Sequence, residues 1–300
     1  MDSRLRGNDS GVCMLGRVLI IAGSDSGGGA GIQADIKTVT ALGGYAMTAV
    51  TAVTVQNTEG VRGYHEIPTD IVAGQITAVL DDIGADVIKT GMLASAAIIE
   101  AVGATLKAYN IPRVVDPVMR AKGGHALLAE DSTAALITHL VKGAALITPN
   151  LPEAEVLTGL SIKTIADMDA AIPALRALGA EAVLLKGGHL EGECLVDLLI
   201  TAHGISRFED HRIDTTATHG TGCTLASAIA AGLADKMTLE DSVARARAYV
   251  RKAILTAPGL GRGHGPLNHG HTVAAFTPDK QRKILGIPRA CTGQTPQLTP

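Results

Sequence analysis

A cysteine stands at the predicted start of a helix, where its thiol could take part in group transfer. The stretch "HGTGCTLASAIAAGL" (219–233) has two glycines before an apolar run with helical spacing. If the helix starts near Gly222 or Cys223, the N–H groups of Gly220, Thr221 and Gly222 converge on one point that favours negative charge. A phosphoryl group in transfer carries such charge. The same field should lower the pKa of Cys223, which could then act as a base. The alternative is a small buried apolar residue behind an ordinary cap by Thr221.

Other polar residues follow predicted strands and suit phosphate chemistry. Asn150 and Glu153 in "TPNLPEAE" have the spacing of a capping box, and they could equally hold magnesium near phosphates. Lys186 in "LLKGGHL" could contact a phosphate as a point charge or simply be solvated. Asp116 in "VVDPVM" could bias a metal ion, and Lys122 follows it on a loop.

A second group of residues suits a flat heterocycle. The amide of Gln56, in "TAVTVQ", can donate and accept together at the edge of a ring. Met92 in "TGML" could supply an adaptable apolar contact, although a core role is the commoner one. The loop "SDSGGGAG" lacks the spacing of a dinucleotide fingerprint. It is either a tight turn between strand and helix, or a close approach to a small flat ligand helped by Asp35.

The elements that must position these residues alternate along the chain. Apolar runs typical of buried strands are separated by stretches with helical spacing, which predicts a mostly parallel sheet with helices on both faces. The expected strands are 17–23, 45–60, 86–91, 113–119, 144–150 and 181–188, with a hairpin about Gly204 in 194–213. The expected helices are 32–44, 69–84, 95–109, 131–141, 152–159, 167–179, 224–235 and 239–257. Ligands of such folds bind beyond the carboxyl ends of the strands, where the polar residues above fall.

Composition narrows the class of protein. The chain has 300 residues, 46% hydrophobic, with a net charge of -3 and no basic stripe, so we expect neither a nucleic-acid nor a membrane partner. The four cysteines fit neither a zinc site nor a disulfide framework, which favours a reducing cytoplasm. We expect one domain over 17–277, a disordered extension over 1–16 with Met14 a possible start, and a weakly ordered tail over 278–300.

Taken together, these motifs resemble the hydroxymethylpyrimidine/phosphomethylpyrimidine kinases of the ribokinase-like superfamily. The resemblance runs from Leu19 to His269 and rests on blocks in one order: "IAGSDSGGGAGIQADIKT", "VTVQNTEGV", "IKTGMLA", "VVDPVM", "LITPNLPEAEVL", "LLKGGHL", "HGTGCTLASAIAA" and "GHGPLNH". It implies a ribokinase-like α/β fold with a small β flap, ATP and Mg²⁺, and a homodimer. It also implies two successive phosphorylations of a hydroxymethylpyrimidine, giving the pyrophosphate used in thiamine biosynthesis.

The resemblance also implies roles for individual residues. It makes Gln56 the reader of the pyrimidine edge, the Gly220–Cys223 turn an anion hole, and Lys186 with Asn150 contacts to nucleotide phosphate. It makes Asn150 and Glu153 the magnesium–phosphate pair, to which the place of Asp116 at a strand end adds a second carboxylate for the metal. The neighbours of Gln56 in the substrate pocket would be Gly23, Asp35, Thr54, Met92 and Val118. This sequence departs from the family pattern at Ser26 and Gly27, where a Pro and a Ser are common.

The thiol has an explanation if the acceptor is first an alcohol and then a phosphate. A phosphate needs no strong base, and an aspartate in the place of Cys223 would repel it. Two alternatives stay open: a pyridoxal kinase of the same superfamily, and a non-catalytic vitamer-binding protein. The histidines of "GHGPLNHGH" match no compact zinc pattern, and the sequence gives His189 and His219 no certain role.

Overall fold

The structure, a computed structural model, describes residues 15–119 and 132–274. The expectations for Lys122, for the tail and for the N-terminal extension up to residue 14 lie outside these ranges. A sheet of nine strands forms the centre of the described part, in the order β3-β2-β1-β4-β5-β6-β7-β8-β9. Neighbours from β2 to β7 run parallel, whereas β3, β8 and β9 pair antiparallel. The strands are β1 (Arg17–Ser24), β2 (Tyr45–Asn57), β3 (Gly60–Glu66), β4 (Val87–Thr90), β5 (Arg113–Val115), β6 (Leu146–Ile147), β7 (Ala182–Lys186), β8 (Cys194–Thr201) and β9 (Gly204–His211).

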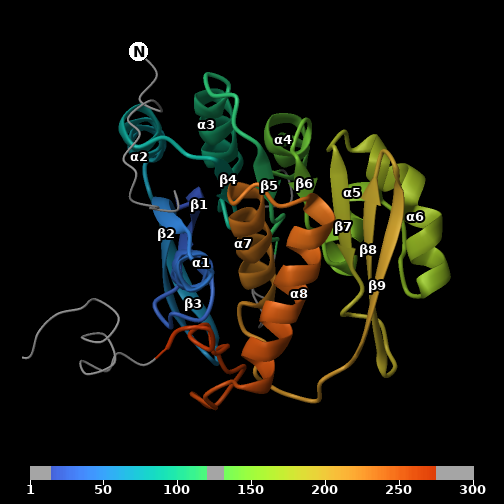
Figure 1. The fold of residues 1–300 in the computed structure, drawn as a ribbon. Helices are drawn as coiled ribbons and strands as arrows, with labels where there is room; N and C mark the ends of the chain where they lie inside the picture. Colours follow the sequence, from blue (N-terminus) through green and yellow to red (C-terminus); the bar gives the residue numbers. More distant parts are fainter. Residues whose placement is uncertain (1–14, 120–131, 275–300) are drawn as a thin grey trace, which may run out of the picture.

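Helices cover both faces of the sheet (Figure 1). One face carries α2 (Thr69–Asp82), α3 (Ala96–Leu106), α4 (Ser132–Leu136), the π-helix η2 (Ile137–Val141), α5 (Leu151–Thr158) and α6 (Ile165–Ala177). The other carries α1 (Gly31–Ala41), α7 (Thr221–Ala234) and α8 (Leu239–Leu255). The predicted α/β fold with a mostly parallel, doubly covered sheet is therefore confirmed.

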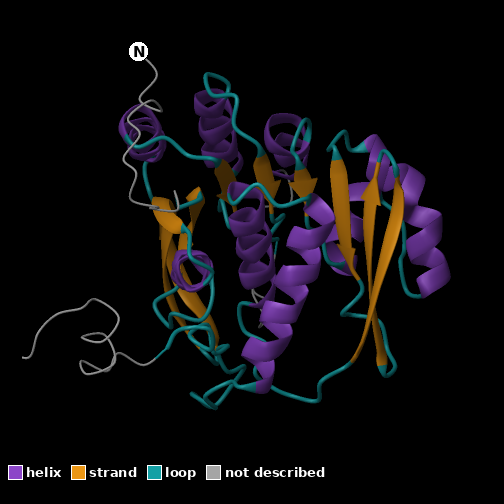
Figure 2. Ribbon diagram, in the orientation of Figure 1, coloured by secondary structure: helices purple, strands orange, loops and turns teal. Residues whose placement is uncertain are grey.

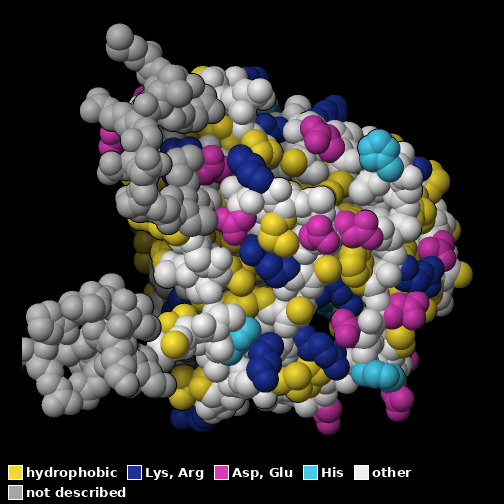
Figure 3. All heavy atoms as spheres, in the orientation of Figure 1, with side chains coloured by type: hydrophobic (Ala, Val, Ile, Leu, Met, Phe, Trp, Pro, Cys, Tyr) yellow, Lys and Arg dark blue, Asp and Glu magenta, His cyan; other side chains and the backbone are white. Residues whose placement is uncertain are grey.

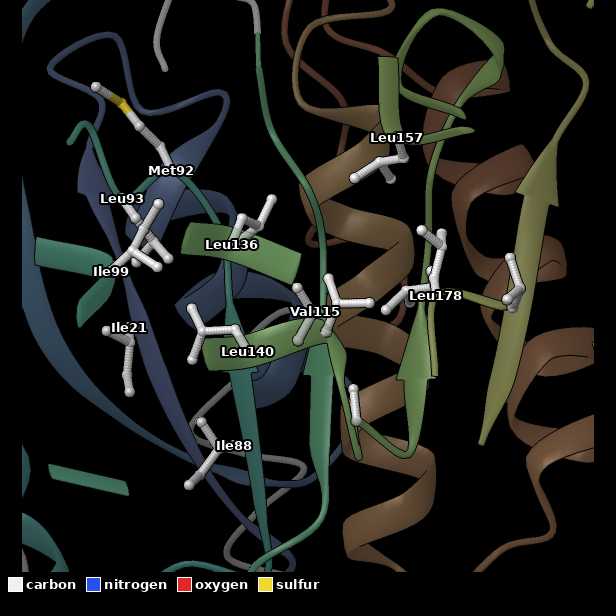
Figure 4. Close-up of a cluster of buried hydrophobic side chains, with 14 of the residues drawn as sticks. Ile21, Ile88, Met92, Leu93, Ile99, Val115, Leu136, Leu140, Leu157 and Leu178 are labelled. Carbon is white, nitrogen blue, oxygen red and sulfur yellow. The ribbon is translucent and has the colours of Figure 1, made fainter. Parts of the chain in front are cut away.

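Two apolar cores lie between the sheet and its helices, one on each face. The parallel strands contribute to both cores, because alternate residues of a strand point to opposite faces. In β1, Leu19 and Ile21 belong to one core, and Val18 and Ile20 belong to the other. Figure 4 shows part of the first core, around Leu136, Leu140 and Val115. Burial of β1 on both faces explains why its sequence is apolar throughout rather than alternating.

Several elements differ in extent from the sequence prediction. β5 and β6 are far shorter than expected, since each is followed by one polar residue and then by a proline, which lacks an N–H for the ladder. The predicted helix at 131–141 is α4 followed by a π-helical turn. The strand β3 has no counterpart among the strands predicted from residue patterns. It forms a hairpin with the end of β2, which is the small flap that the family resemblance implied (Figure 2).

The hairpin predicted about Gly204 is present as β8 and β9, whose last pair is Thr201 with Gly204. Within residues 15–119 and 132–274, no helix has the length and apolar character needed to cross a membrane.

Candidate active site

A cavity of about 1070 Å³ lies at the carboxyl ends of the parallel strands. Its wall draws on the ends of β1, β4 and β7, on the loops after β5 and β6, and on the turn before α7. The cavity therefore joins segments that are far apart in the chain. Apart from Asp35 and from Lys122, which lies outside the described residues, it is lined by the site residues named from the sequence: Gly23, Thr54, Gln56, Met92, Asp116, Val118, Asn150, Glu153, Lys186, Gly220, Thr221, Gly222 and Cys223.

Asp35 lies beneath the cavity rather than on its wall. Its carboxylate has no exposed surface, and its Oδ2 pairs with Lys89 Nζ at 2.8 Å. Its Oδ1 accepts a hydrogen bond from Ser227 Oγ at 2.7 Å. The polar atoms of Asp35 are thus engaged by β4 and α7, and its expected place beside the ligand stays a prediction.

The glycine loop after β1 is organised around a single carboxylate. Asp25 accepts hydrogen bonds from the N–H groups of Gly27, Gly29 and Ala30 at 2.8 to 3.0 Å, and it pairs with His219 Nε2 at 2.8 Å. Burial alone would raise the pKa of Asp25, but the His219 and backbone hydrogen bonds outweigh it and leave that pKa below its usual value. Because these N–H groups already have an acceptor, the loop is a turn tied to the α7 entry and does not cradle a phosphate.

The turn before α7 presents backbone donors to the cavity. The helix begins at Thr221 after Gly220, slightly earlier than predicted, and Gly220 has φ +80° in the left-handed region. A Cβ on Gly220 would collide with Gly29 O, so only glycine fits there. Thr224 N–H donates the first helical bond, to Gly220 O, which leaves the N–H groups of Gly222 and Cys223 at the helix end.

A side chain at Gly222 would enter the charged part of the cavity. An ideal Cβ there lies 3.5 Å from Lys186 Nζ and 3.7 Å from Asp116 Oδ2. Thr221 does not cap the helix, since its hydroxyl donates to Thr218 O at 3.2 Å. The turn therefore offers helix-end N–H groups beside a lysine, an arrangement that suits an anion.

The Cys223 thiol ionises less readily than the sequence suggested. The residue keeps some exposure to the cavity, but its thiol is enclosed, and this burial raises its pKa to about 12. Lys89 and the Gly31 N–H lower that pKa, while Asp35 and Asp116 raise it. The prediction of a lowered pKa is wrong, because loss of hydration outweighs the helix field and Lys89.

Lys186 is paired within the cavity wall. Its Nζ lies 3.3 Å from Asp116 Oδ1, which also accepts a hydrogen bond from Thr148 Oγ1 at 3.0 Å. The side chain of Lys186 is 14% exposed, so this pair faces the cavity. Burial would lower the pKa of Lys186, but Asp116 and Glu153 raise it overall, so the residue is a cation there.

Asn150 and Glu153 form the capping box expected as one of their two interpretations. Asn150 Oδ1 accepts from Glu153 N–H at 2.9 Å, and Glu153 Oε2 accepts from Asn150 N–H at 2.8 Å. Both side chains also line the cavity. Burial, together with the charge of Asp116, raises the pKa of Glu153 to about 7 despite the opposing effect of Lys186.

Gln56 occupies the part of the cavity next to the β2–β3 flap, here called the Gln56 end. Ser26 Oγ accepts from Gln56 N–H and donates to Gln56 O, at 2.9 and 2.7 Å, so this departure from the family pattern fixes the Gln56 backbone. The Gln56 side chain lies 3.2 Å from Thr54 Oγ1 and 3.5 Å from His219 Nε2. The amide is therefore held by neighbours on two sides.

The late histidine segment supports the α7 turn from outside. His219 N–H donates to Gly265 O, and His269 Nε2 lies 2.9 Å from Thr224 Oγ1. His271 Nε2 contacts Tyr249 O instead, at 3.1 Å. Across the described residues, no group of three or more His, Cys, Asp or Glu side chains is arranged to hold a metal ion.

The cavity wall also includes residues of β8, β9 and α8. Arg247 forms ion pairs with Asp197 and Asp210, and Asp197 Oδ1 accepts from Gly187 N–H at 2.9 Å. This network ties the "KGG" loop after β7 to α8. On the face formed by α7 and α8, Lys and Arg side chains are interspersed with Asp and Glu (Figure 3).

Sequence reasoning assigned no role to Asp25, Lys89 and Arg247. A signal existed for Lys89, which is a charged residue inside the apolar run "DVIKTG". Asp25 stands directly before the glycines that it binds. Nothing local marks Arg247, because its two partners lie on strands distant in sequence.

The sequence model of the phosphomethylpyrimidine kinase family matches residues 25–268. The chain belongs to this family. It is 47% identical over 253 residues to the hydroxymethylpyrimidine/phosphomethylpyrimidine kinase of Streptomyces coelicolor, covering 84% of this chain and 94% of that one. It is 52% identical over 255 residues to the thiamine biosynthesis bifunctional protein ThiED of Geobacter sulfurreducens, covering 85% of this chain but 52% of that longer protein.

Solved structures agree with the family. The phosphomethylpyrimidine kinase of Clostridium difficile has a TM-score of 0.71 and 42% identity, covering 79% of this chain and 98% of that one. The pyridoxal kinase of Staphylococcus aureus in complex with pyridoxal has a TM-score of 0.79 and 36% identity, covering 85% of this chain and 94% of that one. The protein is thus a kinase with the fold of the vitamin kinases.

Proposed function

We propose that the protein transfers a phosphoryl group from ATP to 4-amino-5-hydroxymethyl-2-methylpyrimidine, and then a second one to the resulting phosphate ester, in thiamine biosynthesis. The observation that carries the proposal is that one cavity contains both the Gln56 amide and the turn before α7. The amide suits a ring nitrogen and its adjacent amine, while the helix-end N–H groups suit a migrating phosphoryl group.

The size of the cavity supports two substrates at once. Its volume of about 1070 Å³ lies just above the usual range of small-molecule pockets, about 300–1,000 Å³. The pyrimidine would lie at the Gln56 end, with Thr54, Met92 and Val118 around it. The nucleotide would lie beyond Lys186, toward α8, with its phosphates near the α7 turn.

The donor set at the phosphate end fits magnesium. Asp116, Glu153 and Asn150 all line the cavity. The negative charge of Asp116 raises the pKa of Glu153, so the two carboxyl groups are close enough to interact. Mg²⁺ in kinases is commonly held by one or two carboxylates together with substrate phosphates and waters, so a complete protein cage is not required. When bound, the ion would neutralise charge on the transferring phosphates.

A neutral thiol at position 223 suits an enzyme with two acceptors. A carboxylate there would repel the phosphate acceptor of the second step, whereas a thiol with a pKa of about 12 carries little charge at neutral pH. We therefore predict that Cys223→Asp keeps part of the first phosphorylation and loses more of the second, as measured by separate initial rates. Equal losses in the two steps would contradict this explanation.

A coupled ADP-release assay tests the function. We expect turnover with the hydroxymethylpyrimidine and with its monophosphate, both abolished when Mg²⁺ is chelated. The likeness to pyridoxal kinase favours phosphorylation of a pyridoxal-type vitamer as the second candidate function. Pyridoxine and pyridoxal are therefore assayed in parallel. Binding of the pyrimidine without ADP release would instead indicate a vitamer-binding protein.

We further propose a homodimer that works in the cytoplasm, where ATP is available. Exposed apolar side chains on the flap support an association surface: Val53 and Val55 on β2 and Tyr64 on β3 are 39% to 61% exposed. Light scattering on the eluted protein would test the dimer, with a monomer at micromolar concentration counting against it.

A further inference from the structure

A fully buried ion pair, Lys89 with Asp35, contacts α7 near its start, and the proposed function gives it no role. Lys89 and Asp35 both have side chains with no exposed surface, and they pair at 2.8 Å. Lys89 comes from β4 and Asp35 from α1, while Ser227, which donates to Asp35 Oδ1, comes from α7. One small network therefore joins the three elements that converge at the turn.

The network reaches the thiol through the helix. Cys223 and Ser227 are four residues apart on α7, so their side chains share one face. Lys89 and Cys223 both belong to the cavity wall and interact electrostatically. An ammonium has three N–H donors, and Asp35 occupies one of them.

The local sequence leaves room for the ammonium. An ideal Cβ on Gly91 would lie 2.9 Å from Lys89 Nζ, closer than real contacts allow. The glycine of "IKTGMLA" therefore makes the space in which the lysine is folded back under the site. A buried charge is costly unless it is paired, and Asp35 supplies the pairing here.

Resting on the proposed function, we propose that Lys89, held by Asp35 and Ser227, is a positioning residue that promotes proton acceptance by Cys223 in the first phosphorylation. As the hydroxymethyl oxygen bonds to the γ-phosphorus, its proton passes to Cys223 in the small fraction of molecules whose thiol is ionised. The bond from that phosphorus to the bridging oxygen breaks, and ADP keeps the electron pair. The positive charge of Lys89 sets the share of thiolate that can accept this proton. The second acceptor is already ionised and needs no such transfer.

Charges from several neighbouring elements act on the thiol. Lys89 of β4 and Lys186 of β7 favour the thiolate, as does the Gly31 N–H at the start of α1. Asp35 of α1 and Asp116 after β5 oppose it. Removing one member of the sealed pair therefore shifts the balance in a direction set by the sign of its charge.

The test is the pH dependence of iodoacetamide alkylation of Cys223, in the full chain with Cys13, Cys194 and Cys291 replaced by serine. We expect Lys89→Met to slow alkylation at pH 9 by about tenfold, and Asp35→Asn to speed it by a similar factor, since each pKa unit changes the thiolate fraction tenfold. The double variant should return close to the parent. This measurement needs no substrate, so it is independent of the proposed function.

A purely structural pair gives a different result. If the network only supports packing, both single variants loosen the site, and alkylation then accelerates in both, which would overturn the proposal. No change in either variant would overturn it as well. Should Lys89→Met fail to fold, the Asp35→Asn variant is compared with the double variant, which carries both substitutions. These two proteins differ only in the charge of Lys89, so equal alkylation rates would refute the proposal.

Turnover supplies the second readout. In a folded Lys89 variant, kcat of the first phosphorylation should fall about tenfold more than kcat of the second, with the KM for ATP unchanged, since only the first step needs proton acceptance. Equal loss in both steps would contradict the assigned role.

Discussion

Two lysine–aspartate pairs flank the turn before α7, and they differ in their access to solvent. Lys89 and Asp35 are sealed, with no exposed side-chain surface, whereas Lys186 and Asp116 border the cavity and are 14% and 3% exposed. Each aspartate also accepts a hydroxyl hydrogen bond, from Ser227 in the sealed pair and from Thr148 in the open one. The same chemical pair can thus serve two purposes: a sealed charge can act only through its neighbours, while a charge that borders the cavity can contact a ligand.

Breaking the sealed pair should have the largest effect on stability. Lys89→Met leaves the Asp35 carboxylate buried without its cation, which we expect to lower the free energy of unfolding by about 3–5 kcal/mol. Lys186→Met should cost less, because Asp116 borders the cavity, where water can take the place of the lost cation. Urea denaturation of both variants measures the difference, and equal losses would contradict the distinction between the pairs.

Breaking the open pair should instead have the larger effect on nucleotide use. Lys186→Met removes the cation opposite the helix-end N–H groups, so kcat should fall about 100-fold, in line with the loss of one preorganised charge donor. The KM for ATP should rise. Initial rates at saturating pyrimidine measure both, and unchanged rates would remove Lys186 from the phosphate site.

The open pair differs also in having a third charge, Glu153, whose pKa is raised to about 7. The folded protein keeps this proton between about pH 4.5 and 7 whereas the unfolded chain releases it, so stability falls as pH rises through that window. Glu153→Gln should therefore be more stable than the parent by about 1–3 kcal/mol at pH 8, with the gain vanishing near pH 4.5. Urea denaturation without nucleotide at both pH values measures this. A gain that is the same at pH 4.5 and pH 8 would argue against titration of Glu153.

The hydroxyl donors give the finest comparison. Ser227→Ala removes a donor from a sealed carboxylate and should cost about 2 kcal/mol, whereas Thr148→Val, beside the open carboxylate, should cost about 1 kcal/mol. Thermal unfolding of the two variants measures the ordering. The reverse ordering would show that access to the cavity does not relieve Asp116.

Local patterns predicted the parts of the molecule that depend on local causes. The alternation of apolar runs and helical spacing indicated the sheet, and the polar residues at strand ends indicated the cavity wall. The hairpin about Gly204 followed from its turn glycine. The ion pair of Asp35 was not visible locally, because its partner Lys89 lies 54 positions later.

Burial was the property that local patterns could not supply. The pKa of Cys223 was predicted with the wrong sign, because the helix field is visible in the sequence while the loss of hydration depends on packing among distant elements. The shortness of β5 and β6 depends on prolines that were visible but were not given enough weight.

Phosphorus NMR of a single reaction tests the central claim most directly, since it follows both transfers in one sample. With the hydroxymethylpyrimidine, excess ATP and Mg²⁺, we predict a phosphate-ester resonance that appears first and then gives way to a diphosphate, with two ADP formed per pyrimidine. ATP consumption without any phosphorylated pyrimidine would contradict the assignment of the Gln56 end and the α7 turn to one reaction.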